Sequence, residues 1–445
     1  MPSRSALALS LRKDWRELVA ARAWWLFLAA CGVLTGHAYG TAVATYAEVS
    51  GGGGGPAALS QGVSPLDGFL VPLFGAYAIA ATLLLPFVAI RLLSAEKEGG
   101  GLSLMLQGGV RAWTLVTSKF LVAMSGWLVA LVPAVIALAG WRSHGGHLDA
   151  GEVAVVLVGH ALRAAWTIAL ALAAAAFAES ASTAAIVALG VTLATWALDF
   201  VSAVQGGVAQ RLDAFTPESA LRVFERGELS ASVVVASVVV TLALVVIAAH
   251  GLRVSRLPRR TAMLAGVVVL GAALSLGGAS LLRGSADLSE DRRNSFPTAD
   301  ERALRAISAP VDIEVHLAPE DPRLTDLEGS VLRKLRRVLP HVTVRRVGNG
   351  STGLFAADSA YGEVWYRVGG RRAMSRSTTP PIVLETLYGL AGVPAPTPVD
   401  EPAYPGWPIA FRAGPLPAIL MVAWPLLVLA AWWWSRRPSL ATSDP

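Results

Sequence analysis

The sequence contains little cysteine, little lysine and few charged residues of either sign. Its 445 residues include one cysteine, Cys31, so an intrachain disulfide or a thiolate metal site cannot form. The dipeptide Gly-Lys does not occur, which excludes a Walker A nucleotide site, and neither HExxH nor GxSxG is present. The sequence therefore gives no local support to an enzyme centre, a metal site or a cofactor in this chain.

Charged residues make up 15% of the chain and hydrophobic residues 54%, with a mean hydropathy of +0.54. Soluble domains carry about a quarter charged residues, so this composition is typical of a polytopic membrane protein. The net charge of +6 does not indicate a nucleic-acid partner. The basic residues lie beside apolar runs, where Lys and Arg set the orientation of membrane helices.

About eight apolar runs are long enough to form membrane-spanning helices, which need about 20 mostly apolar residues. They are residues 24–44, 69–93, 119–140, 153–177, 183–204, 231–252, 262–282 and 415–434. The first six, with an N-terminal leader, form a predicted core of residues 1–252. A basic loop and the seventh span follow at 253–283, a polar α/β domain at 284–413, and the eighth span with a tail at 414–445.

The loops between these runs alternate in their Lys and Arg content. Basic residues concentrate in the leader, in the second-to-third loop, in the sixth-to-seventh loop "RVSRLPRR" and in the tail, whereas residues 45–68 contain none. Positively charged loops stay in the cytoplasm. We therefore expect a multi-pass protein of a bacterial inner membrane, with both termini cytoplasmic and residues 284–413 extracytoplasmic.

The polar stretch has the pattern of a small α/β domain. Residues 311–317 and 341–347 alternate like strands, and Gly369-Gly370 predicts the turn of a hairpin. Helices are expected over residues 297–307, 324–339 and 380–392.

The sequence of this domain also predicts two helix starts and a basic surface. Thr298 with Glu301, and Thr325 with Glu328, have the spacing of capping boxes at helix starts. Five arginines fit either a solvated face or a surface that binds an anionic glycan or lipid head group. They are Arg333, Arg336, Arg337, Arg345 and Arg346.

The segment "AEKEGGGLSLMLQGGVRAWTLVTSKF", residues 95–120, separates the second and third spans. It is first charged, then rich in glycine, then amphipathic. Glycine breaks a helix and permits a sharp change of direction, and a short amphipathic helix can lie in the membrane interface. The alternative is an ordinary solvated loop, which does not account for the alternation of glycine and apolar residues.

This segment resembles the cytoplasmic coupling region of ABC type-2 transporter permeases, which docks on a separate ATPase subunit. The matching positions are Glu96, Glu98, Gly100, Leu104 and Lys119. The leader "LSLRKDWRELVAARAWW" is similar to the interfacial elbow helix of the same family. The resemblance implies that Glu96, Lys97 and Glu98 lie at the contact with the ATPase, and that ATP and Mg²⁺ bind to that partner alone.

A second resemblance covers roughly residues 285–392. This part is similar to the start of the extracytoplasmic domain in the auxiliary component of gliding-motility-type ABC transporters. The residues that match are Leu288, Glu290, Asp291, Arg292, Pro310 and Val311. It implies that the chain fuses a six-span permease to an auxiliary component that contributes the last two spans.

Together these resemblances imply the transmembrane subunit of a bacterial ABC transporter, forming a homodimer and moving an envelope-related or lipid-like substrate. Two alternatives are open. The external domain can pull on a periplasmic partner without transport, as a mechanotransmission module. The chain can also be a membrane-anchored binding or assembly protein with no coupled ATPase.

Two charged residues, Arg163 and Asp199, lie within the fourth and fifth predicted spans. They are equally distant from the turn near Ala181, so they should lie at the same depth of the membrane. Intramembrane charges usually face the interior of the bundle and pair. We therefore expect an Arg163–Asp199 ion pair, acting as a structural staple or as a substrate contact. His160 either shares that site or is a singly satisfied core histidine.

Overall fold

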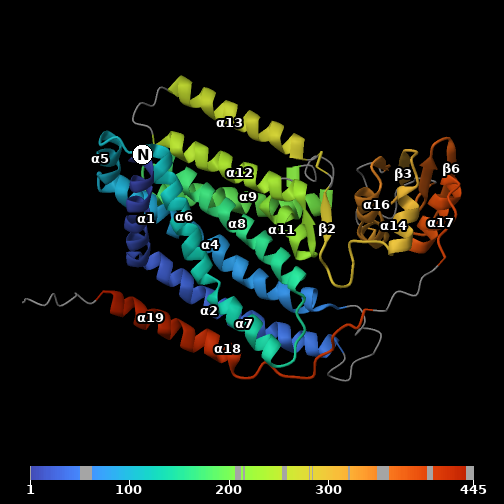
Figure 1. The fold of residues 1–445 in the computed structure, drawn as a ribbon, viewed down its shortest axis with the longest axis horizontal. Coiled ribbons are helices and arrows are strands. Elements are labelled where there is room, and N and C mark those ends of the chain that lie inside the picture. Colours follow the sequence, from blue (N-terminus) through green and yellow to red (C-terminus); the bar gives the residue numbers. More distant parts are fainter. Residues whose placement is uncertain are drawn as a thin grey trace, which may run out of the picture.

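The computed structural model describes residues 2–50, 63–205, 212–213, 216–252, 258–279, 281–282, 284–318, 321–347, 360–397 and 404–436. Long helices lie side by side, and a small α/β unit stands beyond one end of them (Figure 1). The helices α1 (Pro2–Ala20) and α5 (Gly101–Gln107) lie at the opposite end. We name the two ends of the bundle the α5 end and the sheet end.

Seven helices in the described part of the chain are long and apolar enough to cross a membrane, which confirms seven of the eight predicted spans. They are α2 (Arg22–Val49), η1–α4 (Leu66–Leu70, Val71–Glu98), α6–α7 (Ala112–Ala130, Val132–Ser143), α8 (Ala150–Phe177), α9 (Ala181–Gln205), α12 (Ala231–Gly251) and α18–η4–α19 (Leu416–Ala418, Ile419–Ala423, Trp424–Ser435). The predicted seventh span is α13 (Pro258–Ala279), whose described apolar part, Gly266–Ala279, is shorter. The protein is thus a polytopic α-helical membrane protein.

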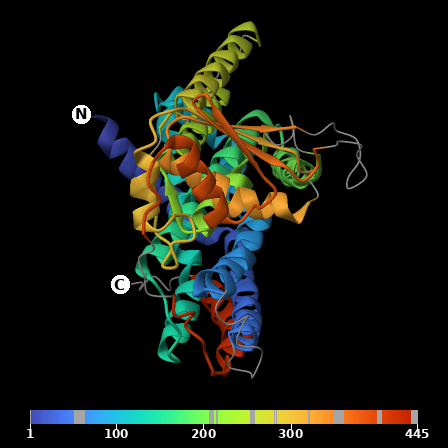
Figure 2. The same cartoon turned by 90° about the vertical axis from the view of Figure 1, so that its right-hand side faces the viewer.

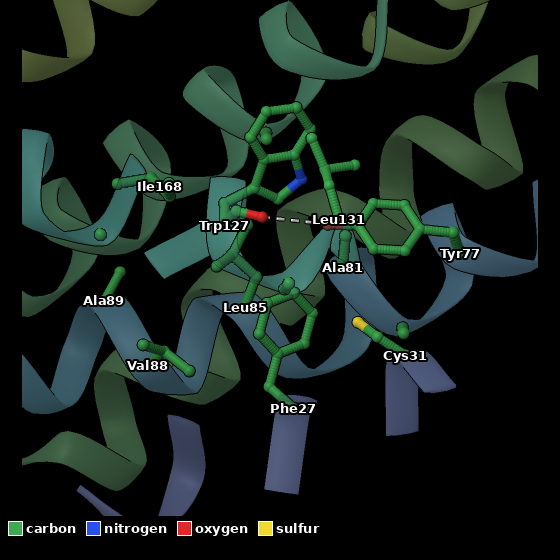
Figure 3. Packing of buried hydrophobic residues seen from close by; sticks show 14 of the residues in the cluster. Phe27, Cys31, Tyr77, Ala81, Leu85, Val88, Ala89, Trp127, Leu131 and Ile168 are labelled. Atoms are coloured by element: carbon green, nitrogen blue, oxygen red, sulfur yellow. Dashed lines mark hydrogen bonds between the residues drawn. The ribbon is translucent and has the colours of Figure 1, made fainter. Parts of the chain in front are cut away.

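The centre of the bundle is packed by apolar side chains from α2, α4, α6 and α8 (Figure 3). Phe27, Leu85 and Ile168 are almost completely buried there. The Tyr77 hydroxyl donates to the carbonyl oxygen of Trp127 at 3.5 Å. This bond satisfies the one polar atom of Tyr77 inside an otherwise apolar region, where an unpaired hydroxyl would be costly.

The last span packs against the first along a stripe of glycines on α2. An added Cβ at Gly36 would lie 2.8 Å from Cβ of Leu420, and one at Gly40 would lie 3.3 Å from Pro417. At Gly32 it would lie only 2.0 Å from the Trp424 ring. Small residues every four positions let two membrane helices approach closely. The final span is therefore an integral part of the bundle that begins with α2.

The α/β unit is a four-stranded sheet with helices (Figure 2). Its strands are β3 (Val311–Val315), β4 (Val342–Arg346), β5 (Val364–Val368) and β6 (Arg371–Ser375), in the order β4-β3-β5-β6. Only the β3–β4 pair is parallel. Its helices are α14 (Thr298–Arg305), α15–η2–α16 (Pro322–Leu327, Glu328–Leu332, Arg333–Val338) and α17 (Pro380–Ala391). The predicted strands, hairpin and helices are all confirmed.

Both predicted capping boxes are wrong. The helix α15 begins one residue after Asp321, whose carboxylate accepts from the backbone N–H of Arg323 at 2.9 Å. Pro322 at the first helical position favours this earlier start, so Thr325 lies inside the helix. In α14, Thr298 is already helical and its hydroxyl accepts from Arg292 at 3.1 Å.

Three of the five predicted surface arginines pair with acids of the same unit. Arg337 pairs with Glu301, and both Arg336 and Arg346 pair with Glu328, at 2.5 Å and 3.4 Å. These contacts favour the structural role over ligand binding for the three side chains.

Several contacts fasten this unit to the sheet end, and one of them is the hydrogen bond from the backbone N–H of Glu290 to the Glu152 carboxylate on α8 at 3.0 Å. The strand β1 (Glu228–Ser230), which precedes α12, pairs antiparallel with β2 (Ser285–Asp287), which follows α13. The guanidinium of Arg293 donates to Asp67 at 2.5 Å and to Ser64 at 2.6 Å, at the start of the second span. The sheet unit is therefore held by hydrogen bonds to several separate parts of the bundle.

The glycine stripe makes a testable prediction. Gly36→Leu should lower the free energy of unfolding by about 1–3 kcal/mol, because the added side chain collides with the last span. Gly190→Leu is the matched control, since an added Cβ at Gly190 has no atom within 4 Å. Thermal unfolding of both purified variants in detergent measures the difference. Equal unfolding temperatures would contradict the close packing of α2 against the last span.

Candidate functional site

The last turn of α4, at the α5 end, joins four other helices. Its three consecutive charged residues, Glu96, Lys97 and Glu98, each have different partners. Glu96 contacts α1 and α6, Lys97 contacts α8, and Glu98 contacts α9. The chain then turns into α5, so this turn connects the surface helix to much of the bundle.

The centre of this site is the buried ammonium group of Lys119, on α6. Its Nζ lies 2.9 Å from Glu96 Oε1 on α4 and 3.0 Å from Asp14 Oδ1 on α1. Lys119 is 0% exposed and Asp14 only 2%. The Ser118 hydroxyl donates to the second oxygen of Asp14. A buried charge is stable only when it is paired and hydrogen-bonded, so this network holds three helices together.

A second, more exposed layer covers this network. The ammonium of Lys13 contacts Glu96 and lies 3.4 Å from Glu17. Burial opposes the charge of Lys13, but the hydrogen bond and the charge of Glu96 outweigh it, so the pKa of Lys13 is raised. Burial also raises the pKa of Glu17, against the nearby lysines.

Three carboxylates of this site, from Asp14, Glu17 and Glu96, lie within 4.8 Å of one another. Such a spacing is compatible with a divalent cation. Here the ammonium groups of Lys13 and Lys119 lie against the same oxygens and supply the positive charge. The cluster is therefore an ion-pair network.

Lys97 and Glu98 hold the ends of two helices. The Lys97 ammonium donates to the carbonyl oxygens of Ala175 and Ala176 at 3.3 Å and 3.2 Å, and also to that of Ala178. A cation is favourable at the C-terminus of a helix such as α8. The Glu98 carboxylate accepts from the first backbone N–H of α9 at 3.4 Å, where negative charge is favourable.

The helix α5 projects from this turn. Gly100 has φ +75°, a left-handed conformation that favours glycine and lets the chain reverse. Leu102 is 5% exposed and anchors α5, whereas Leu104 is 71% exposed. The predicted glycine break and short amphipathic element are thus present, and the helix presents an apolar side chain outward.

The coupling residues predicted from the sequence differ in their burial. Glu96 and Lys119 are buried, so the prediction that Glu96 faces a partner is corrected. The physical reason is that the buried ammonium of Lys119 needs a carboxylate beside it. Leu104 and Glu98 are exposed, and Lys97 is partly buried.

Asp14 belongs to this site but was not predicted from the sequence. It lies four residues before Leu18, which is completely buried, and three after Leu11. Residues at these spacings share one face of a helix. The available signal was the position of the Asp14 carboxylate on the apolar face of the leader, since a buried carboxylate requires a basic partner.

The predicted Arg163–Asp199 ion pair is wrong. Arg163 Nη2 lies 3.2 Å from Glu218 Oε1 and donates to Thr82 Oγ1 at 3.0 Å. Asp199 pairs with Arg222 instead. Both Glu218 and Arg222 belong to α11 (Pro217–Glu225).

The helix α11 explains this exchange of partners. Its segment lies between the fifth and sixth predicted spans and folds as an amphipathic helix that packs on α8. An added Cβ at Gly159 of α8 would lie 2.6 Å from the Phe224 side chain, so glycine permits this approach. The His160 ring lies against Phe74 in a tilted arrangement, with ring centroids 5.2 Å apart, and its Nε2 lies 3.9 Å from Glu225. The acids of α11 therefore lie closer to the α8 side chains than Asp199 does.

Comparison with protein-family models, with curated proteins and with solved structures gives no match.

The buried network makes a second prediction. Lys119→Met should lower the free energy of unfolding by about 3–5 kcal/mol, because it leaves two carboxylates buried without their shared cation. Lys13→Met is the matched control and should cost less than about 1 kcal/mol, since the Lys13 side chain is 43% exposed. Denaturant unfolding of the purified chain measures both. Equal losses would contradict the central role of Lys119.

The correction at Arg163 makes a third prediction. A double-mutant cycle of Arg163→Met with Glu218→Leu should give a coupling energy of about 1–3 kcal/mol, because the two side chains are in contact. The matched cycle of Arg163→Met with Asp199→Leu should give less than about 0.5 kcal/mol. Thermal unfolding of the single and double variants provides both values. A larger coupling in the second cycle would restore the original pairing.

Proposed function

We propose that this polytopic membrane protein is the transmembrane subunit of a bacterial ABC transporter, driven by a separate ATPase subunit that docks at the α5 end. One observation carries the proposal. The short helix α5 presents Leu104 outward, and the turn that precedes it is tied to α1, α6, α8 and α9. An exposed apolar element with such connections is suited to receive force from another chain.

The connections suggest how the force would pass. A push on α5 enters α4 directly through Gly100, and the Lys119 network carries it to α1 and α6. The Lys97 and Glu98 contacts carry it to the adjoining ends of α8 and α9. Packed rigid elements move as bodies when a bound partner closes, so closure of an ATPase would tilt several spans together.

The charge of the chain supports the orientation within this proposal. The leader that forms α1 is basic, and positively charged segments stay in the cytoplasm. The α5 end would therefore be cytoplasmic and the sheet end extracytoplasmic, in an inner membrane. We propose a homodimer with ATP and Mg²⁺ on the ATPase, moving an envelope-related or lipid-like substrate.

A second candidate function is mechanotransmission without transport. It is favoured by the attachment of the α/β unit through the β1–β2 pair and through Arg293 to Asp67 and Ser64. Through these contacts, movement of the spans would reach the sheet unit and a partner in the envelope. The third alternative, an anchored binding or assembly protein, assigns no role to α5.

The docking proposal makes a fourth prediction. Leu104→Asp should abolish co-purification of ATP-hydrolysing activity with the tagged chain from native membranes, because a charge replaces the exposed apolar contact. Met374→Asp, at an exposed apolar residue of the sheet unit, is the matched control and should retain that activity. The unfolding temperature of both variants should equal that of the parent, since both side chains are exposed.

Two results would contradict the proposal. A parent chain that purifies without any ATPase would favour the anchored binding protein. Full ATPase recovery with Leu104→Asp would remove α5 from the docking site.

A further inference from the structure

A cavity of about 450 Å³ lies between α8, α11, α12 and α13. This volume falls within the roughly 300–1,000 Å³ of small-molecule sites in proteins. Its walls are mainly apolar, with Trp166, Val240 and Leu276 from three of the helices, and the guanidinium-bearing side chain of Arg163 also lines it. Two of its four walls, α8 and α12, are long and apolar enough to cross a membrane, so the hydrocarbon chains of lipids can reach it.

The cavity follows α12 over a stripe of positions from Ser232 to Val240. Eight steps along an α-helix cover about 12 Å, so the cavity is extended along the helix axis. On the neighbouring face of the same helix, Val235, Val238 and Leu242 are exposed. Hydrocarbon chains would contact this face, which places lipid directly beside the cavity.

Arg163 brings a guanidinium group to the cavity, and the positive charge of this group is balanced by a neighbouring carboxylate. Among the described residues, the guanidinium is hydrogen-bonded through Nη2 only, to Glu218 and Thr82. An arginine has five N–H donors, so donors are left for a ligand. The carboxylate of Glu218, 3.2 Å away, balances the positive charge. A neutral oxygen acceptor therefore fits this site better than an anion.

We infer that this cavity binds an acyl chain of a membrane lipid, and that Arg163 donates a hydrogen bond to an ester oxygen of that lipid. The apolar walls accommodate the chain, and the balanced Arg163–Glu218 pair selects the uncharged ester over a charged head group. This binding site goes beyond the proposed function and does not depend on an ATPase.

The test compares two tryptophan substitutions on α12. Val240→Trp fills the cavity, whereas Val238→Trp, two residues away on the exposed face, is the matched control. Native mass spectrometry of the full chain, delipidated and titrated with palmitoyl-oleoyl phosphatidylglycerol, measures lipid retention. The parent and Val238→Trp should retain one lipid per chain, and Val240→Trp should bind it at least about tenfold more weakly. Equal binding by the two tryptophan variants would overturn the inference.

A second variant and a second lipid complete the test. If Val240→Trp does not fold, Ala236→Leu fills the same cavity with a smaller change and should also weaken binding. Phosphatidylcholine with the same chains should bind within about threefold of phosphatidylglycerol, because the site recognises the chain and ester. A preference above about tenfold for phosphatidylglycerol would replace the inference with a site for anions.

Discussion

The arrangement of the α5 end depends on the need to neutralise one buried charge. The ammonium of Lys119 is 0% exposed, and such a group is stable inside a protein only beside carboxylates. Asp14 comes from α1 and Glu96 from α4, so satisfying one charge fixes the position of two further helices. The same turn of α4 supplies Lys97 and Glu98 to other helix ends. The surface helix α5 is thereby attached to a turn that contacts four other helices.

The last span and the sheet unit are joined to this bundle by different physical means. Gly32 and Gly36 let the last span lie directly on α2, so close helix packing holds it, together with the hydrogen bond from the Trp424 indole N–H to the carbonyl oxygen of Leu28 at 2.8 Å. Arg293 and the β1–β2 pair use hydrogen bonds at the sheet end. The first and last spans of the chain therefore meet in one continuous bundle.

The sequence predicts the parts of this structure that depend on local patterns. Apolar runs gave seven spans, alternation gave the strands, and Gly369 gave the hairpin turn. The ion pairs could not be predicted from local patterns, because equal depth in a membrane does not establish which side chains meet. Arg163 and Asp199 lie on neighbouring spans, yet α11 supplies the partners of both. The local sequence of α11 does not indicate that this helix packs against α8, because tertiary packing determines its position.

The most direct test of whether the Lys119 network holds α1 against the α4–α5 turn is a distance measurement by pulsed electron paramagnetic resonance. Spin labels would replace Arg12 on α1 and Gln107 on α5, both exposed, after Cys31→Ala removes the native cysteine. If the Lys119 network joins α1 to the α4–α5 turn, the parent gives one narrow distance distribution and Lys119→Met gives a broad one. An equally narrow distribution in Lys119→Met would show that α1 and α5 are held together without the buried charge.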